Sequence, residues 1–344
     1  MDKRNSFSYV LSPEQQAALA AVLQGGNYRP VTMPYTLAAA DGDRCRIALY
    51  TSGKLLVQGK GAEDFVAFVL EPLVLQHVGV GYEKVLDPRA FQPHMGVDES
   101  GKGDYFGPLV TAGAYVDGGL VDRLRELGVK DSKRFTSDTS LLKVAAELRR
   151  VLGERHYTLV TIGPAKYNQL YARIRNVNAL LSWCHARVIE NLLEKVPDCP
   201  RAISDQFGSK SQVERALMGR GRKIELVQQH RAESDMAVAA ASILAREAFL
   251  YGLRKAGETA GVQFPKGASD ATRAAAQELV RKHGPAALLA NVKCHFKVTD
   301  AVLASLGLTR SVLGPEGSVV SKVVNFRRPG QGGGAKDDRA PAGA

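Results

Sequence analysis

Apolar positions in the first part of the chain follow helical spacing and then strand spacing. Residues 14–24 carry apolar side chains at helical intervals behind Ser12-Pro13, and Gly25-Gly26 ends the pattern. Proline fits the first turn of a helix, so a helix is predicted here. Residues 44–50 alternate between polar and apolar, and residues 54–59 follow across a short turn at Gly53. This arrangement predicts a β-hairpin.

A second pattern of mixed strands and helices begins near residue 95. Strands are expected at residues 96–97, 109–116, 202–205 and 223–227, and helices at 141–151, 177–194 and 234–253. Strands interleaved with helices in this order favour an α/β layer architecture.

The patterns predict four segments along the chain. An N-terminal domain covers residues 1–85 and a linker with two prolines covers 86–94, followed by a larger α/β domain at 95–310. Residues 311–344 are rich in Gly, Pro, Ala and charge, which is typical of a disordered tail.

Charge is concentrated in the larger domain. The net charge is +11, yet residues 1–94 hold nine Lys and Arg against nine Asp and Glu, whereas residues 95–310 hold 32 against 23. A basic domain commonly binds a polyanion such as nucleic acid, although other basic soluble proteins share this composition.

Hydropathy and cysteine spacing argue against a membrane or secreted protein. The longest nearly uncharged apolar run, residues 236–245, is half the length that a bilayer requires, and no apolar segment follows the charged N-terminus. The four cysteines form no CxxC pair, so neither a zinc site nor a disulfide framework is predicted. We expect a cytoplasmic chain with reduced thiols.

One glycine-rich segment nearly matches a phosphate-binding loop. Gly96 and Gly101-Lys102 have P-loop spacing, but Gly103 stands where Ser or Thr must ligate magnesium. Asp98 and Glu99 would also lie inside the loop and repel a triphosphate by roughly 4 kcal/mol for each close pair of charges. A nucleoside triphosphatase is therefore not expected.

The acidic residues of this region suggest a metal site instead. Asp98 and Glu99 end one predicted strand, Asp205 ends another, and Asp235 begins a helix of small residues. Carboxylates at the ends of core elements are ligands for hard divalent cations, which relieve their mutual repulsion. For Asp235 alone, a helix cap or a partner of the helix dipole is the commoner role.

Four separated segments resemble one known group of enzymes. They are Asp98-Glu99-Ser100-Gly101-Lys102-Gly103-Asp104, Ser204-Asp205-Gln206-Phe207, Glu233-Ser234-Asp235 and Val238-Ala239-Ala240-Ala241-Ser242-Ile243-Leu244-Ala245-Arg246. In this order they resemble the type 2 ribonuclease H superfamily over residues 95–310. The Gly-Lys-Gly triplet and the added N-terminal domain resemble its ribonuclease HIII branch. The N-terminal domain is similar in layout to that branch's substrate-binding domain, which is like the TATA-binding protein.

The resemblance implies a fold, an activity and a catalytic set. It implies an RNase H-like mixed sheet with helices, plus an α+β N-terminal domain, in an endonuclease that cuts the RNA strand of RNA/DNA hybrids. We also expect a monomer. Asp98, Glu99, Asp205 and Asp235 match the metal-binding acids, which would hold two Mg²⁺ or Mn²⁺ ions for in-line attack and leave 5′-phosphate ends.

The resemblance also implies substrate contacts. Ser100, Gly101, Lys102 and Gly103 would lie against the substrate, with glycine allowing close approach to 2′-hydroxyls, the groups that distinguish RNA from DNA. A tight turn that needs glycine explains the same residues structurally. Lys133 lies in a segment that the family uses to approach phosphates, and a polar surface loop is nearly as good an interpretation.

Two other functions stay open at this point. An RNase HII-like enzyme would cut at single ribonucleotides embedded in DNA, although Lys102 in place of arginine and the N-terminal domain argue against it. A nucleic-acid binding protein without activity would have no use for carboxylates where phosphate must lie.

Overall fold

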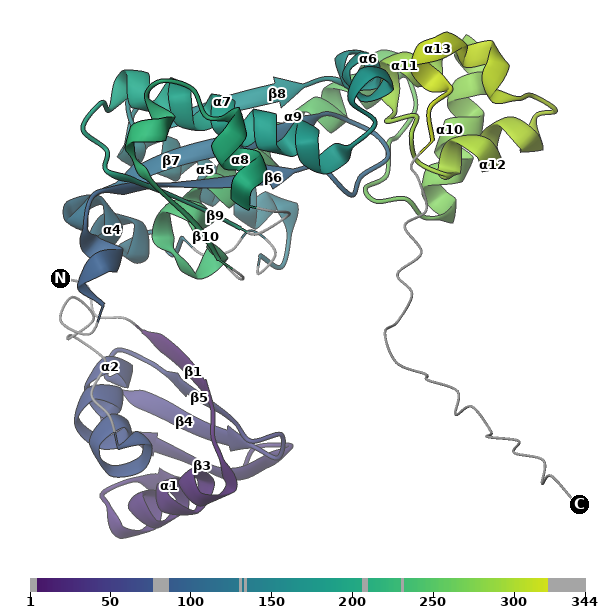
Figure 1. The fold of residues 1–344 in the computed structure, drawn as a ribbon. Coiled ribbons are helices and arrows are strands. Elements are labelled where there is room, and N and C mark those ends of the chain that lie inside the picture. The colour runs from purple at the N-terminus through teal and green to yellow at the C-terminus, as the bar shows by residue number, and fades with distance from the viewer. Residues whose placement is uncertain are drawn as a thin grey trace, which may run out of the picture.

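The computed structural model describes residues 5–76, 87–129, 132, 135–205, 210–229 and 232–320. Figure 1 shows these residues in two bodies, each built on its own five-stranded sheet. The two bodies are joined through residues 77–86, which lie outside the described part of the chain.

The N-terminal body has helices on one face of an antiparallel sheet. Its elements are β1 (Ser6–Val10), α1 (Pro13–Gly25), β2 (Arg29–Pro30), β3 (Thr36–Gly42), β4 (Cys45–Tyr50), β5 (Lys54–Gln58), α2 (Ala62–Phe65) and the π-helix η1 (Val66–Leu75). The strand order is β1-β5-β4-β3-β2. The predicted helix and hairpin are present as α1 and β4-β5, whereas β1 and β3 were not predicted.

Strand β4 shows why this body folds as the alternation predicts. Cys45, Ile47 and Leu49 are buried in the core under the helices, while Arg46 on the other side is exposed and pairs with Asp41 at 2.6 Å. This outer face carries polar side chains into solvent. The role of the N-terminal body in substrate binding stays a prediction.

The larger body begins with a mixed sheet and its covering helices. Its elements up to residue 260 are η2 (Pro88–Phe91), β6 (His94–Ser100), β7 (Leu109–Val116), α4 (Gly118–Glu126), α5 (Asp138–Leu152), β8 (Tyr157–Ile162), α6 (Pro164–Ile174), α7 (Val177–Lys195), β9 (Arg201–Asp205), α8 (Lys210–Ala216), η4 (Gly221–Lys223), β10 (Glu225–Gln229), η5 (Ala232–Ser234) and α9 (Met236–Ala260). The order is β10-β9-β6-β7-β8, with β6 parallel to β9 and antiparallel to β7. Strand β8 is the one strand of this sheet that the sequence pattern missed.

The central strand β6 is buried on both faces because helices cover both. Met95 and Val97 pack in one cluster with Val188 and Leu192 of α7. On the opposite face, a Cβ added to Gly96 would lie 2.1 Å from the backbone nitrogen of Val238 in α9. Alternate residues of β6 therefore face different helices, as the period of a strand requires.

Helix α9 is long and apolar enough to cross a membrane by length and composition alone. It is the one such helix among the described residues, and 61% of its most apolar window is buried inside the protein. Burial against β6 and β7 is the behaviour of a core helix.

A helical lobe completes the larger body at one end of the sheet (Figure 1). It consists of α10 (Asp270–His283), α11 (Ala287–Asn291), α12 (Val298–Ser305), η6 (Arg310–Leu313) and α13 (Gly314–Gly317). Helix η6 begins at Arg310 and α13 ends at Gly317, so both extend into the region 311–344 for which the sequence predicted a disordered tail. Leu313 is buried in the core, which explains why the order continues this far.

The contact between β6 and α9 predicts a large cost for a single methyl group. Gly96→Ala places its Cβ against the backbone of Ala237 and Val238, which no side-chain rotation can relieve. We expect a loss of about 3 kcal/mol in the free energy of unfolding, or a Tm lower by roughly 10 °C. Gly163→Ala is the matched control, because nothing lies within 4 Å of its added Cβ. Equal melting temperatures for the two variants would contradict this packing.

Candidate active site

The two parallel strands bring Asp98 and Asp205 to the same edge of the sheet. Strand β6 pairs with β9 in the register Gly96 with Ile203 and Val97 with Ser204. Continuing this register by one residue sets Asp205 opposite Asp98, on the same face of the sheet. Among the described residues, the Asp205 carboxylate makes no hydrogen bond or ion pair.

Asp98 lies in an electrostatically unfavourable position. Burial, and then the neighbouring charge of Glu99, raise the pKa of Asp98 to about 7. The carboxylate accepts hydrogen bonds from the Ser242 side chain on α9 and from the Glu99 backbone N–H at 2.8 Å. Ser242 also lies 2.8 Å from the hydroxyl of Ser132. A cation at this carboxylate would relieve both causes of the raised pKa.

Glu99 points to the opposite face, toward α7. Its Oε2 accepts a hydrogen bond from His185 Nε2 at 3.0 Å, and Lys102 Nζ lies 3.7 Å from Oε1. Burial alone raises the pKa of Glu99, but the hydrogen bond and charge of His185, together with Lys102, outweigh it and hold that pKa below its ordinary value. His185 thus has a hydrogen-bonding role that keeps Glu99 ionised.

Asp235 is the N-cap of α9. Its Oδ1 accepts hydrogen bonds from the backbone N–H groups of Ala237 at 2.9 Å and Val238 at 3.1 Å, and its Oδ2 lies 2.9 Å from His94 Nε2. The other ring nitrogen of His94 faces the carbonyl of Gln92 at 2.7 Å. The helix-cap role considered from the sequence is therefore present, and both oxygens of Asp235 already have partners. Metal binding by Asp235 stays a prediction.

Glu233 is an acid that the sequence reasoning did not single out. It lies in η5, whose Ala232 packs with Ile203 of β9 and Val238 of α9. This packing holds the turn beside the strand that ends at Asp205. In the described part of the chain, the half-buried Glu233 side chain has no hydrogen bond or ion pair. Its place in the matched Glu233-Ser234-Asp235 segment was the available signal.

The donor set fits a hard divalent cation in its chemistry. Within the described residues no three His, Cys, Asp or Glu side chains form a metal-binding group. The acids at the edge of β6 and β9 are oxygen donors, and the buried Asp98 carboxylate is destabilised beside Glu99. Oxygen donors of this kind suit Mg²⁺ and Mn²⁺ rather than zinc or copper.

The two glycines of the turn after β6 differ in whether the fold requires them. Gly101 has φ +86°, and a Cβ there would lie 2.1 Å from the carbonyl oxygen of Pro108, so the fold itself requires glycine. A Cβ added to Gly103 meets nothing within 4 Å. Ser100 is buried at the end of β6, whereas Lys102 is partly exposed beside Glu99. Lys133 falls outside the described residues.

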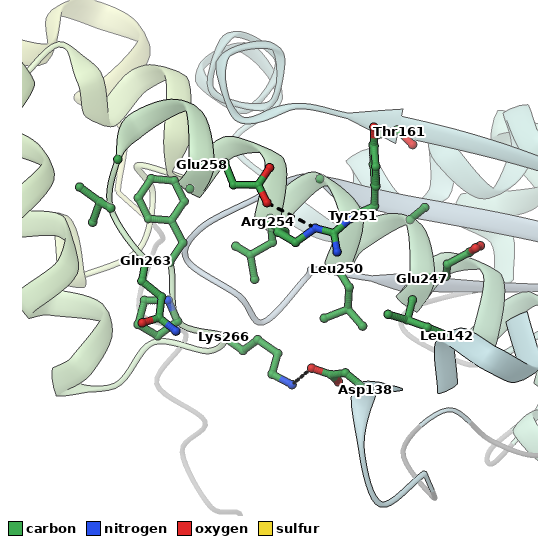
Figure 2. A pocket seen from close by; sticks show the side chains of 18 of the residues that line it. Asp138, Leu142, Thr161, Glu247, Leu250, Tyr251, Arg254, Glu258, Gln263 and Lys266 are labelled. Carbon is green, nitrogen blue, oxygen red and sulfur yellow. Dashed lines mark hydrogen bonds and ion pairs between the residues drawn. The ribbon is translucent and has the colours of Figure 1, made fainter. Parts of the chain in front are cut away.

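A large groove lies away from these acids. It has a volume of about 1150 Å³ and is lined by the second half of α9, residues 261–266 and parts of α5. Figure 2 shows Lys266 reaching Asp138 across one side of it, at 2.7 Å. None of the four predicted acids lines this groove, so the edge of β6 and β9 remains the candidate active site.

Comparison with known proteins gives this arrangement a class. Residues 95–299 match the family model described as Ribonuclease HII, and residues 8–74 match a model described as a domain of unknown function, DUF3378. The structure of Bst-RNase HIII in complex with Mn²⁺ superposes with a TM-score of 0.61 at 27% identity, covering 87% of this chain and 98% of that one. The fold and the matched region define a type 2 ribonuclease H, and the predicted fold class is confirmed.

Sequence relatives narrow the class. Ribonuclease HIII of Protochlamydia amoebophila strain UWE25 is 43% identical over 279 residues, which cover 80% of this chain and 90% of the relative. Ribonuclease HIII of Chlamydia trachomatis serovar D is 39% identical over 306 residues, covering 88% and 98%. The chain belongs to the ribonuclease HIII family.

Family membership settles the reaction class. The chain is a ribonuclease, a hydrolase with ribonuclease H activity on RNA paired with DNA. The alternative of a binding protein without activity is wrong. The cytoplasmic location, the monomeric state and the individual site residues stay predictions.

The raised pKa of Asp98 predicts a gain in stability when its charge is removed. The pKa of Asp98 is about 7 in the folded state against an ordinary value of 3.8, so above pH 7 the folded state carries a buried charge that destabilises it. As the pH falls below 7 the folded state takes up a proton and this penalty shrinks. In chelator, Asp98→Asn should therefore be more stable than wild type by about 1–3 kcal/mol at pH 8 and by little at pH 5.

Thermal unfolding in chelator at pH 5, 6.5 and 8 measures this difference. Asp270→Asn is the control, since that side chain is 91% exposed. Parallel pH profiles for Asp98→Asn and wild type would show that Asp98 carries no such penalty.

Proposed function

We propose that this enzyme hydrolyses the RNA strand of RNA/DNA hybrids by a two-metal mechanism at the edge of β6 and β9, leaving 5′-phosphate ends. The observation that carries the proposal is the register that sets Asp205 opposite Asp98 beside the glycine turn. Asp98, Glu99, Asp205 and Asp235 would hold two Mg²⁺ or Mn²⁺ ions. When bound, such ions activate water and neutralise charge on the scissile phosphate and the departing 3′ oxygen.

Neighbouring side chains and amides hold the proposed ligands Asp98 and Glu99 in place and control their ionisation. Ser242 and the Glu99 amide hold the Asp98 carboxylate by hydrogen bonds. His185 and Lys102 keep Glu99 ionised and therefore available as a ligand. No histidine or cysteine nucleophile is needed, because water is the attacking group.

The fourth acidic position has two candidates. Asp235 matches the family pattern but caps α9 and pairs with His94. Glu233 stands two residues earlier beside β9, with no described partner. Among the described residues Oδ2 of Asp235 accepts only from His94 and has a second lone pair, so Asp235 can bind metal without leaving the helix cap, and Glu233 is the alternative ligand.

The glycine turn would select RNA. With β6 fixing its start, the main chain at Gly101–Gly103 would meet 2′-hydroxyls of the hybrid, and Lys102 would supply a point charge near a phosphate. The open space around Gly103 supports this use, since the fold leaves that position free.

Charge-removing substitutions test the catalytic set. Asp98→Asn and Asp205→Asn should each lower the cleavage rate on the order of 1000-fold while keeping hybrid affinity, because shape remains and a ligand charge is lost. Asp235→Asn keeps the helix cap, since asparagine caps as well as aspartate. Comparing it with Glu233→Gln in a Mg²⁺ titration of cleavage identifies the fourth acid by the larger loss.

Asp270→Asn again serves as the control and should cleave at the wild-type rate. Near wild-type turnover by Asp98→Asn and Asp205→Asn would end the catalytic assignment. Mass analysis of the products from wild type checks the 5′-phosphate separately.

The two glycines of the turn should respond differently to one added methyl. Gly103→Ala should fold like wild type yet cleave hybrid about 10-fold or more slowly, because its Cβ occupies space reserved for substrate. Gly101→Ala should melt earlier, because its Cβ meets the Pro108 carbonyl at 2.1 Å and its φ is positive. Melting curves paired with hybrid cleavage rates separate the two effects. Wild-type cleavage by Gly103→Ala would remove the turn from substrate recognition.

A further inference from the structure

We propose that Lys293, a buried lysine between α11 and α12, is a positioning residue that fixes the far end of the Gly101–Gly103 turn and thereby supports the selection of RNA. The inference rests on the proposed function of that turn. It assigns a role in recognition to a residue of the helical lobe, which the acids of the sheet do not contact.

The Lys293 side chain ends on the segment that follows the turn. Its Nζ donates hydrogen bonds to the carbonyl oxygens of Asp104 at 2.9 Å, Phe106 at 3.3 Å and Gly107 at 2.7 Å. The residue is fully buried. An ammonium group has three donors and no acceptor, so these three carbonyls use its whole capacity.

Backbone contacts hold the same segment from two sides. Lys293 N donates to Tyr105 O at 2.8 Å, and Phe106 forms an antiparallel bridge with Val292. On the other side, Gly267 N donates to Asp104 Oδ1 at 2.6 Å, and Tyr105 N donates to Gly267 O at 2.9 Å. Residues 104–107 are therefore clamped between the helical lobe and the loop before α10.

This clamp defines which part of the turn is presented to substrate. Strand β6 fixes the chain up to Ser100, and the Pro108 carbonyl closes over Gly101. The clamp fixes the chain from Asp104 onward. Only Lys102 and Gly103 stand between the two fixed ends, with open space around Gly103.

Burying the charged ammonium group of Lys293 destabilises the folded state. Burial lowers the pKa of Lys293 to about 7, against a smaller raising effect from Asp104. A buried cation is retained only where its hydrogen bonds serve a purpose that an apolar residue cannot serve, and a well-packed apolar side chain is often the more stable choice. Fixing three carbonyls that would otherwise lack partners next to a recognition turn is such a purpose.

The consequence is a geometric requirement on recognition. A shift of about 1 Å in a group that positions substrate can lower catalysis about 100-fold. Loss of the Lys293 ammonium frees three carbonyls at the end of the turn. The turn should then lose its fixed distance from the edge of β6 and β9.

Lys293→Met keeps the length of the side chain and removes its donors. We expect kcat/KM for the hybrid to fall about 30- to 100-fold. We also expect the ratio of hybrid affinity to DNA-duplex affinity, measured in Ca²⁺, to fall at least about 5-fold, because the turn that distinguishes the two is displaced. Lys293→Arg keeps the charge with a planar fork and should lose less of this ratio.

Arg310→Met is the matched control in the same lobe. Arg310 donates to the carbonyls of Cys294, Phe296 and Gly317 and, unlike Lys293, to no carbonyl of residues 104–107. Its loss should lower Tm while leaving the hybrid-to-duplex affinity ratio at the wild-type value. All rates are compared at least 15 °C below each variant's own Tm.

Two results would overturn the role of Lys293. One is a folded Lys293→Met with a wild-type affinity ratio, and the other is an equal loss of that ratio in Arg310→Met. If Lys293→Met does not fold, Lys293→Gln decides the question, since its amide offers at most two donors to the three carbonyls and a wild-type ratio in this variant contradicts the role.

Gly103→Ala separates this inference from the function on which it depends. If Gly103→Ala keeps the wild-type ratio, the turn does not read 2′-hydroxyls and the proposed function fails at that point. If Gly103→Ala lowers the ratio and Lys293→Met does not, only the role of Lys293 fails. In the double variant the two losses should not add, because both act through one turn.

Discussion

The close contact between β6 and α9 is the constraint on which the site depends. Gly96 lets the strand touch the first turn of the helix, and alanines at 237, 239, 240, 241 and 245 keep the two elements close along their length. The contact sets Ser242 against Asp98 and the helix start against His94. Strand pairing then adds Asp205. One packing interaction and one register thus gather side chains that are up to 144 residues apart in the sequence.

Most of the acidic side chains of the site are stabilised by a neighbouring positive or hydrogen-bond-donating group. Glu99 is stabilised by His185 and Lys102, and Asp235 by the start of α9 and His94. Asp98 forms no ion pair with the described residues and has a raised pKa. A divalent cation would compensate the charge there, and Bst-RNase HIII has been solved in complex with Mn²⁺. The helical lobe contributes in a different way, by fixing the segment that follows the glycine turn.

Local signals in the sequence were enough for the long elements and for the motif acids. Helices α7 and α9, the β4-β5 hairpin and the strand that carries Asp98 follow from spacing, capping and turn residues. The sequence could not reveal contacts made only by tertiary packing, such as His94 with Asp235 across 141 residues or Lys293 with Gly107 across 186. Strand β8 and the lobe helices were missed although β8 is apolar at Tyr157, Leu159, Val160 and Ile162, because periodicity does not separate strand from helix in short apolar runs. For Asp235, the sequence predicted the helix cap as a possible role. It did not predict the hydrogen bond between the other carboxylate oxygen and His94.

The central claim is that divalent metal binds at the edge formed by Asp98 and Asp205. Anomalous diffraction from crystals grown with Mn²⁺ tests it without relying on activity. The account predicts anomalous peaks within about 2.3 Å of carboxylate oxygens of Asp98 and Asp205. Whether Glu233 or Asp235 also lies within this distance of a peak shows which of the two acids is a ligand. Bound Mn²⁺ located only elsewhere, with the Asp98 and Asp205 side chains ordered and free of metal, would contradict it.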